Sequence, residues 1–339
     1  MKVVLAPDSY KGCLSAKEGA GVLASALRSM HPGWEIVECP LADGGEGTVE
    51  TILSATGGML CEAVVSDPLG RPVTARFGMK DDTAFIEVAE ACGLKHLSHD
   101  ELDPLNATSY GVGELLMAAR QRGASRFIVG LGGTATCDGG VGMMKVAGIR
   151  KAMEGCEMEL LCDVDNPFVG KYGAARVFAP QKGASAADVE VLEKRLEAQA
   201  FGIFAETGVD IRNLAGAGAA GGLGGAMMAY FDAAGVSGIG RILELVGFES
   251  LIEGAGLIVT GEGKSDLQTL GGKVAHGVLR HSKGIPVVLV SGRIEDIKAL
   301  REAGFSKLIQ ATPEDMPLGE ALKKDTAMRN LAAAATSIA

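Results

Sequence analysis

The chain has 339 residues, and its 49 glycines are about twice the share found in an average protein. With 47% apolar and 22% charged residues the composition is globular, and the length suits about two domains. The net charge of −10 argues against binding to nucleic acid or to an anionic membrane, because both need a basic face. An anionic small molecule stays open as a ligand, since an acidic protein can still hold local positive charge.

The cysteines and the apolar runs indicate where the protein works. Seven cysteines, an odd number with no C-x-x-C pair, support neither a zinc site nor a disulfide framework. The apolar N-terminus turns polar at Asp8, too early for a signal peptide, and the uncharged stretch 214–231 contains six glycines. We therefore expect a cytoplasmic protein with no nucleic-acid or membrane partner, and a homo-oligomer remains open.

The chain begins with a β-α-β-α pattern. Residues 2–6 read as a buried strand, and Ser15 to Glu18 form a capping box that starts a helix. Residues 34–39 predict a second strand and 47–55 a second helix. Alternation of this kind is typical of a parallel sheet.

From about residue 60 the pattern changes to short strands. Residues 61–66, 73–79 and 84–88 predict an antiparallel meander, because the turns between them are too short for crossover helices. Further elements follow in order: a helix over 110–120, a strand over 127–131, a strand ending at 160–162 and a helix over 187–205.

The α/β alternation returns after about residue 245. Strands are expected over 256–260, 286–290 and 307–310, with helices around 273–281 and 294–303. Two strands at the front and three at the back predict one doubly wound parallel sheet in residues 1–60 plus 245–339. Residues 61–244 would form an inserted second α/β domain.

Glycines gather with acids and hydroxyls in four loops, over 43–48, 132–140, 216–225 and 260–266. Several follow a predicted strand, where doubly wound folds bind ligands. Glycine lets backbone N–H groups approach phosphate oxygens, and carboxylates suit Mg²⁺. The alternative is that these loops only connect closely packed elements.

Two familiar motifs are matched only in part. Residues 216–221 satisfy G-x-G-x-x-G with Asp232 downstream, but no convincing strand precedes them. Because the motif itself is matched, an NAD(P)-dependent oxidoreductase that uses this loop remains an alternative. Residues 263–265 look like the end of a Walker A loop, yet Ile258 stands where its first glycine belongs.

Ordered segments along nearly the whole chain resemble one family, the glycerate kinases of the bacterial, Walker-less type. The matching segments are 6–12, 40–48, 67–71, 108–113, 132–140, 162–167, 178–184, 216–224 and 260–273. The resemblance implies ATP-dependent phosphorylation of D-glycerate with Mg²⁺, usually at the 2-hydroxyl, with the 3-phosphate product left open. It also implies a flavodoxin-like domain joined to an α/β domain of mixed sheet.

The chain departs from the family pattern in three places. The segment between Gly142 and Leu160 is shorter than usual, Cys137 stands where Asn is common, and 274–276 replace a more usual proline-containing stretch. The first departure bears on local strand order and the second on the polar contacts of the 132–140 loop.

Phosphoryl transfer needs the triphosphate to be held in place, its negative charge to be neutralised by cations, and the attacking hydroxyl of the substrate to be positioned in line. The candidate catalytic residues are Asp8, Lys11, Asp43 and Asp266, with Asp43 and Asp266 as alternatives for the general base. Candidate substrate contacts are Ser9, Glu46, Arg71 and Lys182, and candidate metal ligands are Asp163, Asp165 and Glu262. The candidate phosphate and nucleotide contacts are Gly44, Gly45, Gly132, Gly133, Thr134, Gly218, Gly221, Gly261, Gly263 and Lys273.

Each candidate also has a structural interpretation. Asp8 could cap a turn, Asp43 and Glu46 fit a reciprocal helix cap, and Lys182 could be a solvated loop lysine. Arg71 lies in a turn, where arginine is more often exposed than bound to a carboxylate. A non-catalytic protein that binds an acidic ligand is the remaining alternative function.

Overall fold

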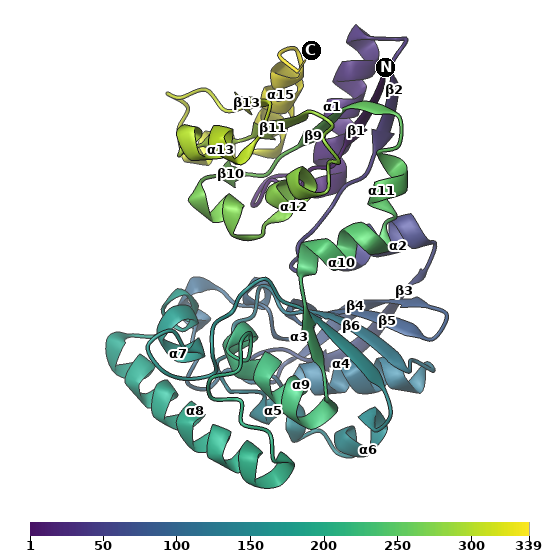
Figure 1. Cartoon of the computed structure of the whole chain (residues 1–339). Coiled ribbons are helices and arrows are strands. Elements are labelled where there is room, and N and C mark those ends of the chain that lie inside the picture. The colour runs from purple at the N-terminus through teal and green to yellow at the C-terminus, as the bar shows by residue number, and fades with distance from the viewer. Residues whose placement is uncertain (339) are drawn as a thin grey trace. The chain divides into compact units, whose positions relative to one another are not determined.

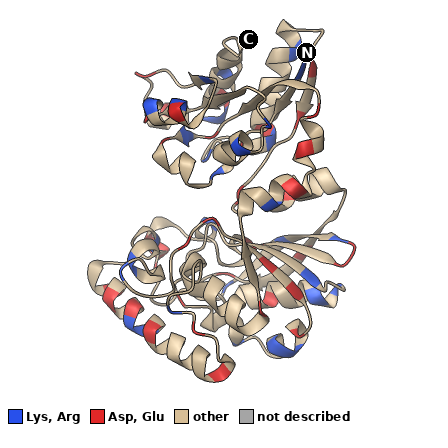
Figure 2. Ribbon diagram, in the orientation of Figure 1, with Lys and Arg blue, Asp and Glu red and all other residues tan. Residues whose placement is uncertain are grey.

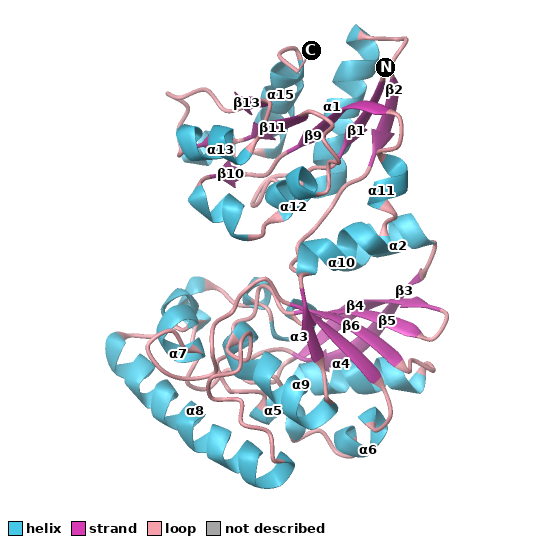
Figure 3. Cartoon of the chain, in the orientation of Figure 1, coloured by secondary structure: helices cyan, strands magenta, loops and turns pink. Residues whose placement is uncertain are grey.

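The computed structural model describes residues 1–338, and the chain divides into two compact units. Unit 1 consists of Met1–Asp43 and the segment from Ile239 to the C-terminus, and unit 2 is Gly44–Gly238 (Figure 1). Both units combine helices with a sheet (Figure 3). No helix within residues 1–338 is both long enough and apolar enough to cross a membrane.

Unit 1 is built on a sheet of five parallel strands. Their order across the sheet is β13 (Lys307–Gln310), β11 (Val287–Ser291), β9 (Ala255–Thr260), β1 (Lys2–Leu5) and β2 (Glu35–Glu38). Counted along the chain of this unit, that is the 2-1-3-4-5 order of flavodoxin-like folds. The doubly wound sheet expected from the sequence is thus confirmed.

The helices of unit 1 follow its strands. Ser15 caps α1 (Ala16–Met30) through the expected capping box: the Glu18 N–H donates to Ser15 Oγ at 3.2 Å, and the Ser15 N–H donates to Glu18 Oε2 at 2.9 Å. Leu23 and Leu27 of α1 join Leu331 of α15 (Lys324–Ala335) in one apolar core against the sheet. The other helices are α10 (Gly238–Leu245), α11 (Phe248–Leu251), α12 (Val274–Arg280), α13 (Ile297–Ala303) and α14 (Leu318–Ala321).

Unit 2 has a mixed sheet of six strands. Their order is β3 (Met59–Ser66), β4 (Pro72–Lys80), β5 (Thr83–Glu87), β6 (Arg126–Gly130), β7 (Glu157–Leu161) and β8 (Ala234–Val236). The pairs β3–β4 and β4–β5 are antiparallel, whereas β5 to β8 run parallel. The predicted meander is therefore correct, and β8 is a strand that the sequence patterns missed because it is only three residues long.

The helices of unit 2 surround this sheet and form a second apolar core beside it. They are α2 (Thr48–Thr56), α3 (Ala89–Cys92), α4 (Tyr110–Gln121), α5 (Val141–Met144), α6 (Ile149–Met153), α7 (Ala174–Phe178), α8 (Ala186–Thr207) and α9 (Leu223–Phe231). Helix α8 buries Leu192, Leu196 and Ile203 at helical spacing against α7, and Figure 2 shows charges of both signs along it.

The units meet in sequence at 43/44 and 238/239, whereas the sequence pattern predicts domain boundaries at 60/61 and 244/245. The difference has a physical cause at each end. Leu53 of α2 lies against Gly78 of β4, where an added Cβ would be 3.0 Å from Leu53 Cδ2, so this helix packs on the mixed sheet. Ile239 of α10 packs against Gly277 of α12 and so belongs with the parallel sheet.

Candidate functional site

Loops that follow β1, β2, β9 and β11 meet at the carboxyl edge of the sheet in unit 1. The Asp8 N–H donates to Gly261 O at 2.8 Å, and the Tyr10 hydroxyl donates to Val290 O at 3.0 Å. A Cβ on Gly261 would lie 1.8 Å from Val290 O, so only glycine allows this approach. Sequence segments more than 250 residues apart therefore share one edge, where doubly wound folds bind ligands.

Three of the candidate acids interact at this edge. Asp8 is half-buried, and burial together with the charges of Asp43 and Glu262 raises its pKa to about 7. The Ser9 N–H opposes the rise by donating to Asp8 Oδ1 at 2.6 Å. Lys11, two residues further on, is exposed. The edge thus combines a carboxyl group that titrates near neutral pH with a nearby solvent-facing cation.

Glu262 has a hydrogen-bonded environment of its own. Its Oε1 accepts from Ser265 Oγ at 3.0 Å and from Thr269 Oγ1 at 2.6 Å. Lys273 Nζ lies 3.6 Å from Oε2. Burial raises the pKa of Glu262, and the Thr269 hydroxyl and the Lys273 ammonium oppose that rise. Lys273 also precedes the first turn of α12, so a positive charge and a helix N-terminus lie together.

Asp266 mainly shapes its own loop. It caps the 3-10 turn Leu267–Gly271 by accepting from the Gln268 N–H at 2.8 Å, and Lys264 Nζ lies 3.4 Å from its Oδ2. Although burial acts to raise the pKa of Asp266, these partners hold it below its usual value. A carboxylate with a lowered pKa is a weaker base, so this geometry favours the capping interpretation of Asp266.

In unit 2 the 44–48 loop lies on the carboxyl ends of β6 and β7. A Cβ on Gly44, which has φ +97°, would be 2.9 Å from Leu161 Cβ. A Cβ on Gly130 would be 2.3 Å from Gly44 O, and one on Gly132 would be 2.8 Å from Gly45 Cα. Glycine is therefore required here for backbone-to-backbone packing, independently of any phosphate. Glu46, at the tip of this loop, is exposed.

Lys182 is buried beside the loop that follows β6. Its side chain is 2% exposed, and Nζ donates to Thr134 Oγ1 at 3.0 Å and to Thr136 O at 2.6 Å. Burial lowers the pKa of Lys182. The solvated-lysine interpretation is therefore wrong. In the same loop Gly133 has φ +75° and accepts from the Leu94 N–H, which ties the loop to the segment after β5.

Sequence reasoning missed Glu87, the last residue of β5. This carboxyl group is 6% exposed, and its Oε1 accepts from the Val49 N–H at the start of α2 at 2.8 Å. Burial raises the pKa of Glu87 to about 6. The signal was available, because Glu87 lies near the end of the strand predicted over 84–88, much as Asp8 lies just past the strand predicted over 2–6.

Glu87 anchors the loop that carries Gly44 and Gly45, and this can be tested. We expect Glu87→Ala to lower the free energy of unfolding by about 2 kcal/mol, because Val49 N–H would be buried without a partner. Glu87→Gln keeps an acceptor and should lie within about 1 kcal/mol of wild type. Denaturant unfolding of both variants measures the difference, and equal losses would contradict the anchoring role.

Glu87 should also make stability depend on pH. A carboxyl group with a raised folded-state pKa stabilises the fold at low pH, and this contribution is lost as pH rises through about 6. Relative to Glu87→Gln, the wild type should therefore be more stable at pH 4.5 than at pH 8.

Comparison with known proteins adds independent information. A model of the glycerate kinase family matches residues 3–152 and 144–339. The chain belongs to the glycerate kinase family. It is 40% identical to a glycerate kinase of Bacillus subtilis and 38% identical to the glycerate 2-kinase of Escherichia coli, covering 95% of this chain and 93% of either relative. The crystal structure assigned to glycerate kinase 2 of Salmonella typhimurium LT2 matches with a TM-score of 0.82 at 37% identity, over 99% of this chain and 98% of that one.

Members of the glycerate kinase family are phosphotransferases, and so is this chain. The alignment with the Bacillus subtilis relative runs over 356 positions, more than the 339 residues of this chain, so the relative has residues where this chain has none. The two segments matched by the family model overlap at 144–152. This overlap lies in the 142–160 segment that the sequence analysis described as short.

Arg71 and Asp163, two further candidate site residues, make local contacts within unit 2. The Arg71 guanidinium, in the β3–β4 turn, is paired with Asp67 and Glu101 at 2.6 Å each. Asp163 Oδ1 accepts from the Gly238 N–H at 2.9 Å and from Ser237 Oγ at 3.0 Å, whereas Asp165 is exposed. Among residues 1–338 no three His, Cys, Asp or Glu side chains are grouped so that they could hold a metal ion.

The G-x-G-x-x-G segment packs against other loops of unit 2. A Cβ on Gly218 would be 2.2 Å from Pro167 O, and one on Gly221 would be 2.1 Å from Thr136 O. Residues 208–215 before it form no strand. The strand–turn–helix frame of a dinucleotide site is therefore absent from this part of the described chain, and the glycines here are explained by packing.

Proposed function

We propose that this protein transfers the γ-phosphoryl group of ATP to the 2-hydroxyl of D-glycerate. The hydroxyl oxygen forms the new bond to phosphorus, the bond to the ADP oxygen breaks, and the hydroxyl proton passes to a carboxylate of the protein. The observation that carries this proposal is Asp8, a carboxyl group at the sheet edge whose pKa is about 7. A base with a pKa near the working pH accepts a proton most effectively.

The other roles are proposed around Asp8. Burial raises the pKa of Asp8 and the charge of Asp43 adds to the rise, so Asp43 is proposed as a residue that tunes Asp8 rather than as the base. Lys11 and Lys273 are the cations of this edge that would neutralise phosphate charge, and the backbone around Gly261 and Gly263 would approach phosphate oxygens.

Mg²⁺ fits this edge as a partner of ATP. Mg²⁺ usually binds one or two carboxylates together with substrate phosphates, so a dedicated protein cage is not needed. Asp8 and Asp43 repel each other, and a cation would relieve that repulsion. We propose Asp43 as its protein ligand at this edge in place of the set Asp163, Asp165 and Glu262, which leaves Asp8 to accept the hydroxyl proton. The ion would neutralise charge on the transferred phosphoryl group.

For the substrate we propose Lys182 as a partner of the glycerate carboxylate. A buried ammonium is costly unless an anion joins it, and its present partners are a hydroxyl and a carbonyl oxygen. Thr134, whose Oγ1 accepts from Lys182 Nζ at 3.0 Å, would supply a hydroxyl contact beside it. The Arg71 guanidinium already binds two carboxylates, which makes it a weaker candidate.

The test mixes the protein with MgATP and D-glycerate, follows ADP, and identifies the product by ³¹P NMR. We expect ADP release that depends on D-glycerate, a much lower rate with L-glycerate, and 2-phosphoglycerate as product. Formation of 3-phosphoglycerate would contradict transfer to the 2-hydroxyl. Absence of ADP above a control without glycerate, from folded protein, would overturn the kinase proposal, and NADH oxidation instead would favour the oxidoreductase alternative.

A further inference from the structure

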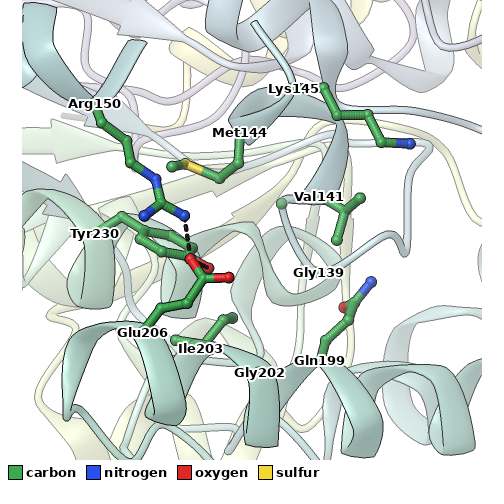
Figure 4. A pocket seen from close by; sticks show the side chains of 11 residues that line it. Gly139, Val141, Met144, Lys145, Arg150, Gln199, Gly202, Ile203, Glu206 and Tyr230 are labelled. Atoms are coloured by element: carbon green, nitrogen blue, oxygen red, sulfur yellow. Dashed lines mark hydrogen bonds and ion pairs between the residues drawn. The ribbon is translucent and has the colours of Figure 1, made fainter. Parts of the chain in front are cut away.

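Unit 2 contains a pocket away from the residues assigned to phosphoryl transfer. It has a volume of about 300 Å³, which is at the lower end of the range of small-molecule sites. Apolar side chains of α5, α8 and α9 line its floor, among them Val141, Met144 and Ile203 (Figure 4). A pocket with an apolar floor and a few polar groups is the usual form of a small-molecule site.

Charge in the pocket favours an anion. Its ionised side chains are Lys145, Arg150 and Glu206, so the lining carries one net positive charge. Arg150 is neutralised, because it pairs with Glu206 and stacks on the Tyr230 ring at 4.4 Å. Within residues 1–338 Lys145 has no carboxylate partner, and Figure 4 shows it across the pocket from that pair. Lys145 is therefore the group that an anion would meet.

The side-chain amide of Gln199 favours a ligand that donates a hydrogen bond. Its Nε2 donates to Asp138 O at 2.9 Å, while its buried Oε1 has no hydrogen-bond partner. An unpaired buried acceptor costs free energy, so a hydrogen bond donated to it by a ligand would stabilise the bound state. A hydrogen-bond donor on a bound ligand would give Gln199 Oε1 its missing partner.

Three residues that line the pocket, Met144, Lys145 and Arg150, lie in the 142–160 segment, which the family resemblance implies is shorter than usual. We propose that this shortened segment forms a binding site for a small organic monoanion with an apolar body and one hydrogen-bond donor. The site is separate from glycerate and ATP binding and does not depend on the proposed function.

A suitable probe is 4-hydroxyphenylacetate, which combines a carboxylate, an aromatic ring and a hydroxyl donor. Ligand-observed NMR titration of the full chain should give a Kd on the order of 1 mM. Tyramine, with an ammonium in place of the carboxylate, should not bind, and 4-methoxyphenylacetate, without the donor, should bind several-fold more weakly. Saturating D-glycerate with an unhydrolysable ATP analogue should leave the Kd unchanged.

Two variants locate the site. Gly202 lies in α8 on the pocket wall, and a Cβ there would meet no atom within 4 Å, so Gly202→Trp should fill the pocket in a folded protein and abolish binding. Lys145→Gln should weaken binding about tenfold, whereas Lys194→Gln, on the exposed side of α8, should not change it. Absence of probe binding at about 10 mM, unchanged affinity in Lys145→Gln, equal binding of tyramine, or competition by glycerate would each overturn the proposal.

Discussion

Replacing Asp8 by Asn is expected to lower kcat for glycerate phosphorylation by about a thousandfold or more while making the protein more stable at pH 8. General-base catalysis contributes about 10²–10⁴ in rate, and this substitution removes the proposed base. The Asn oxygen can keep the hydrogen bond from the Ser9 N–H, which Asp8 Oδ1 now accepts at 2.6 Å. The local backbone should therefore be preserved.

The gain in stability follows from the sign of the pKa shift. Burial and the charge of Asp43 raise the folded-state pKa of Asp8 to about 7 from an ordinary value of 3.8. The ionised form is thus disfavoured in the folded state, so wild-type stability decreases as pH rises through about 7. Asn carries no charge, and after allowance for solvent screening the gain at pH 8 should be on the order of 1 kcal/mol.

The same assignment predicts a pH profile. In the wild type kcat/KM should rise with pH up to about 7, because only ionised Asp8 accepts the hydroxyl proton. The matched control is Asp81→Asn in the β4–β5 turn, where φ is +52° and Asn is well tolerated. This control should keep wild-type turnover. An Asp8→Asn enzyme with turnover near wild type would remove Asp8 as the base and return Asp43 to that role.

The fold could be predicted because its signals are local. Periodic apolar residues and the Ser15 capping box define α1, and tight turns define the β3–β4–β5 meander. The domain boundary was harder to place, because Leu53 gives α2 the same helical pattern whichever sheet it packs on. Only tertiary contact with Gly78 assigns this helix to the mixed sheet.

The candidate site was predicted less completely, because its properties depend on burial. Sequence placed Lys182 in a loop but could not indicate that its ammonium is enclosed by Thr134 and Thr136. The sequence pattern could not show whether Asp266 acts as a general base or caps its loop. In the structure the hydrogen bond from the Gln268 N–H and the nearby Lys264 ammonium favour the capping role. The glycine surplus suggested phosphate contact, and the structure adds that Gly44, Gly130 and Gly132 are also needed for backbone packing.

That packing role makes Gly130→Ala a strongly destabilising substitution in unit 2. The new Cβ would lie 2.3 Å from Gly44 O and 3.0 Å from Gly44 C, so a buried backbone segment has to move. We expect a loss of about 3 kcal/mol or more in the free energy of unfolding, and a lower kcat because the 44–48 loop is displaced. Thermal unfolding and ADP release measure the two effects.

Gly202→Ala is the matched control for this substitution. It adds the same methyl group in the interior of α8, where no atom lies within 4 Å of the new Cβ. Because glycine weakens a helix interior, this variant should gain about 0.5–1 kcal/mol and keep its activity. If Gly130→Ala matched it in stability and turnover, the 44–48 loop would be free to shift. The glycines at the ends of β6 and β7 would then have to be explained by ligand contact rather than by packing.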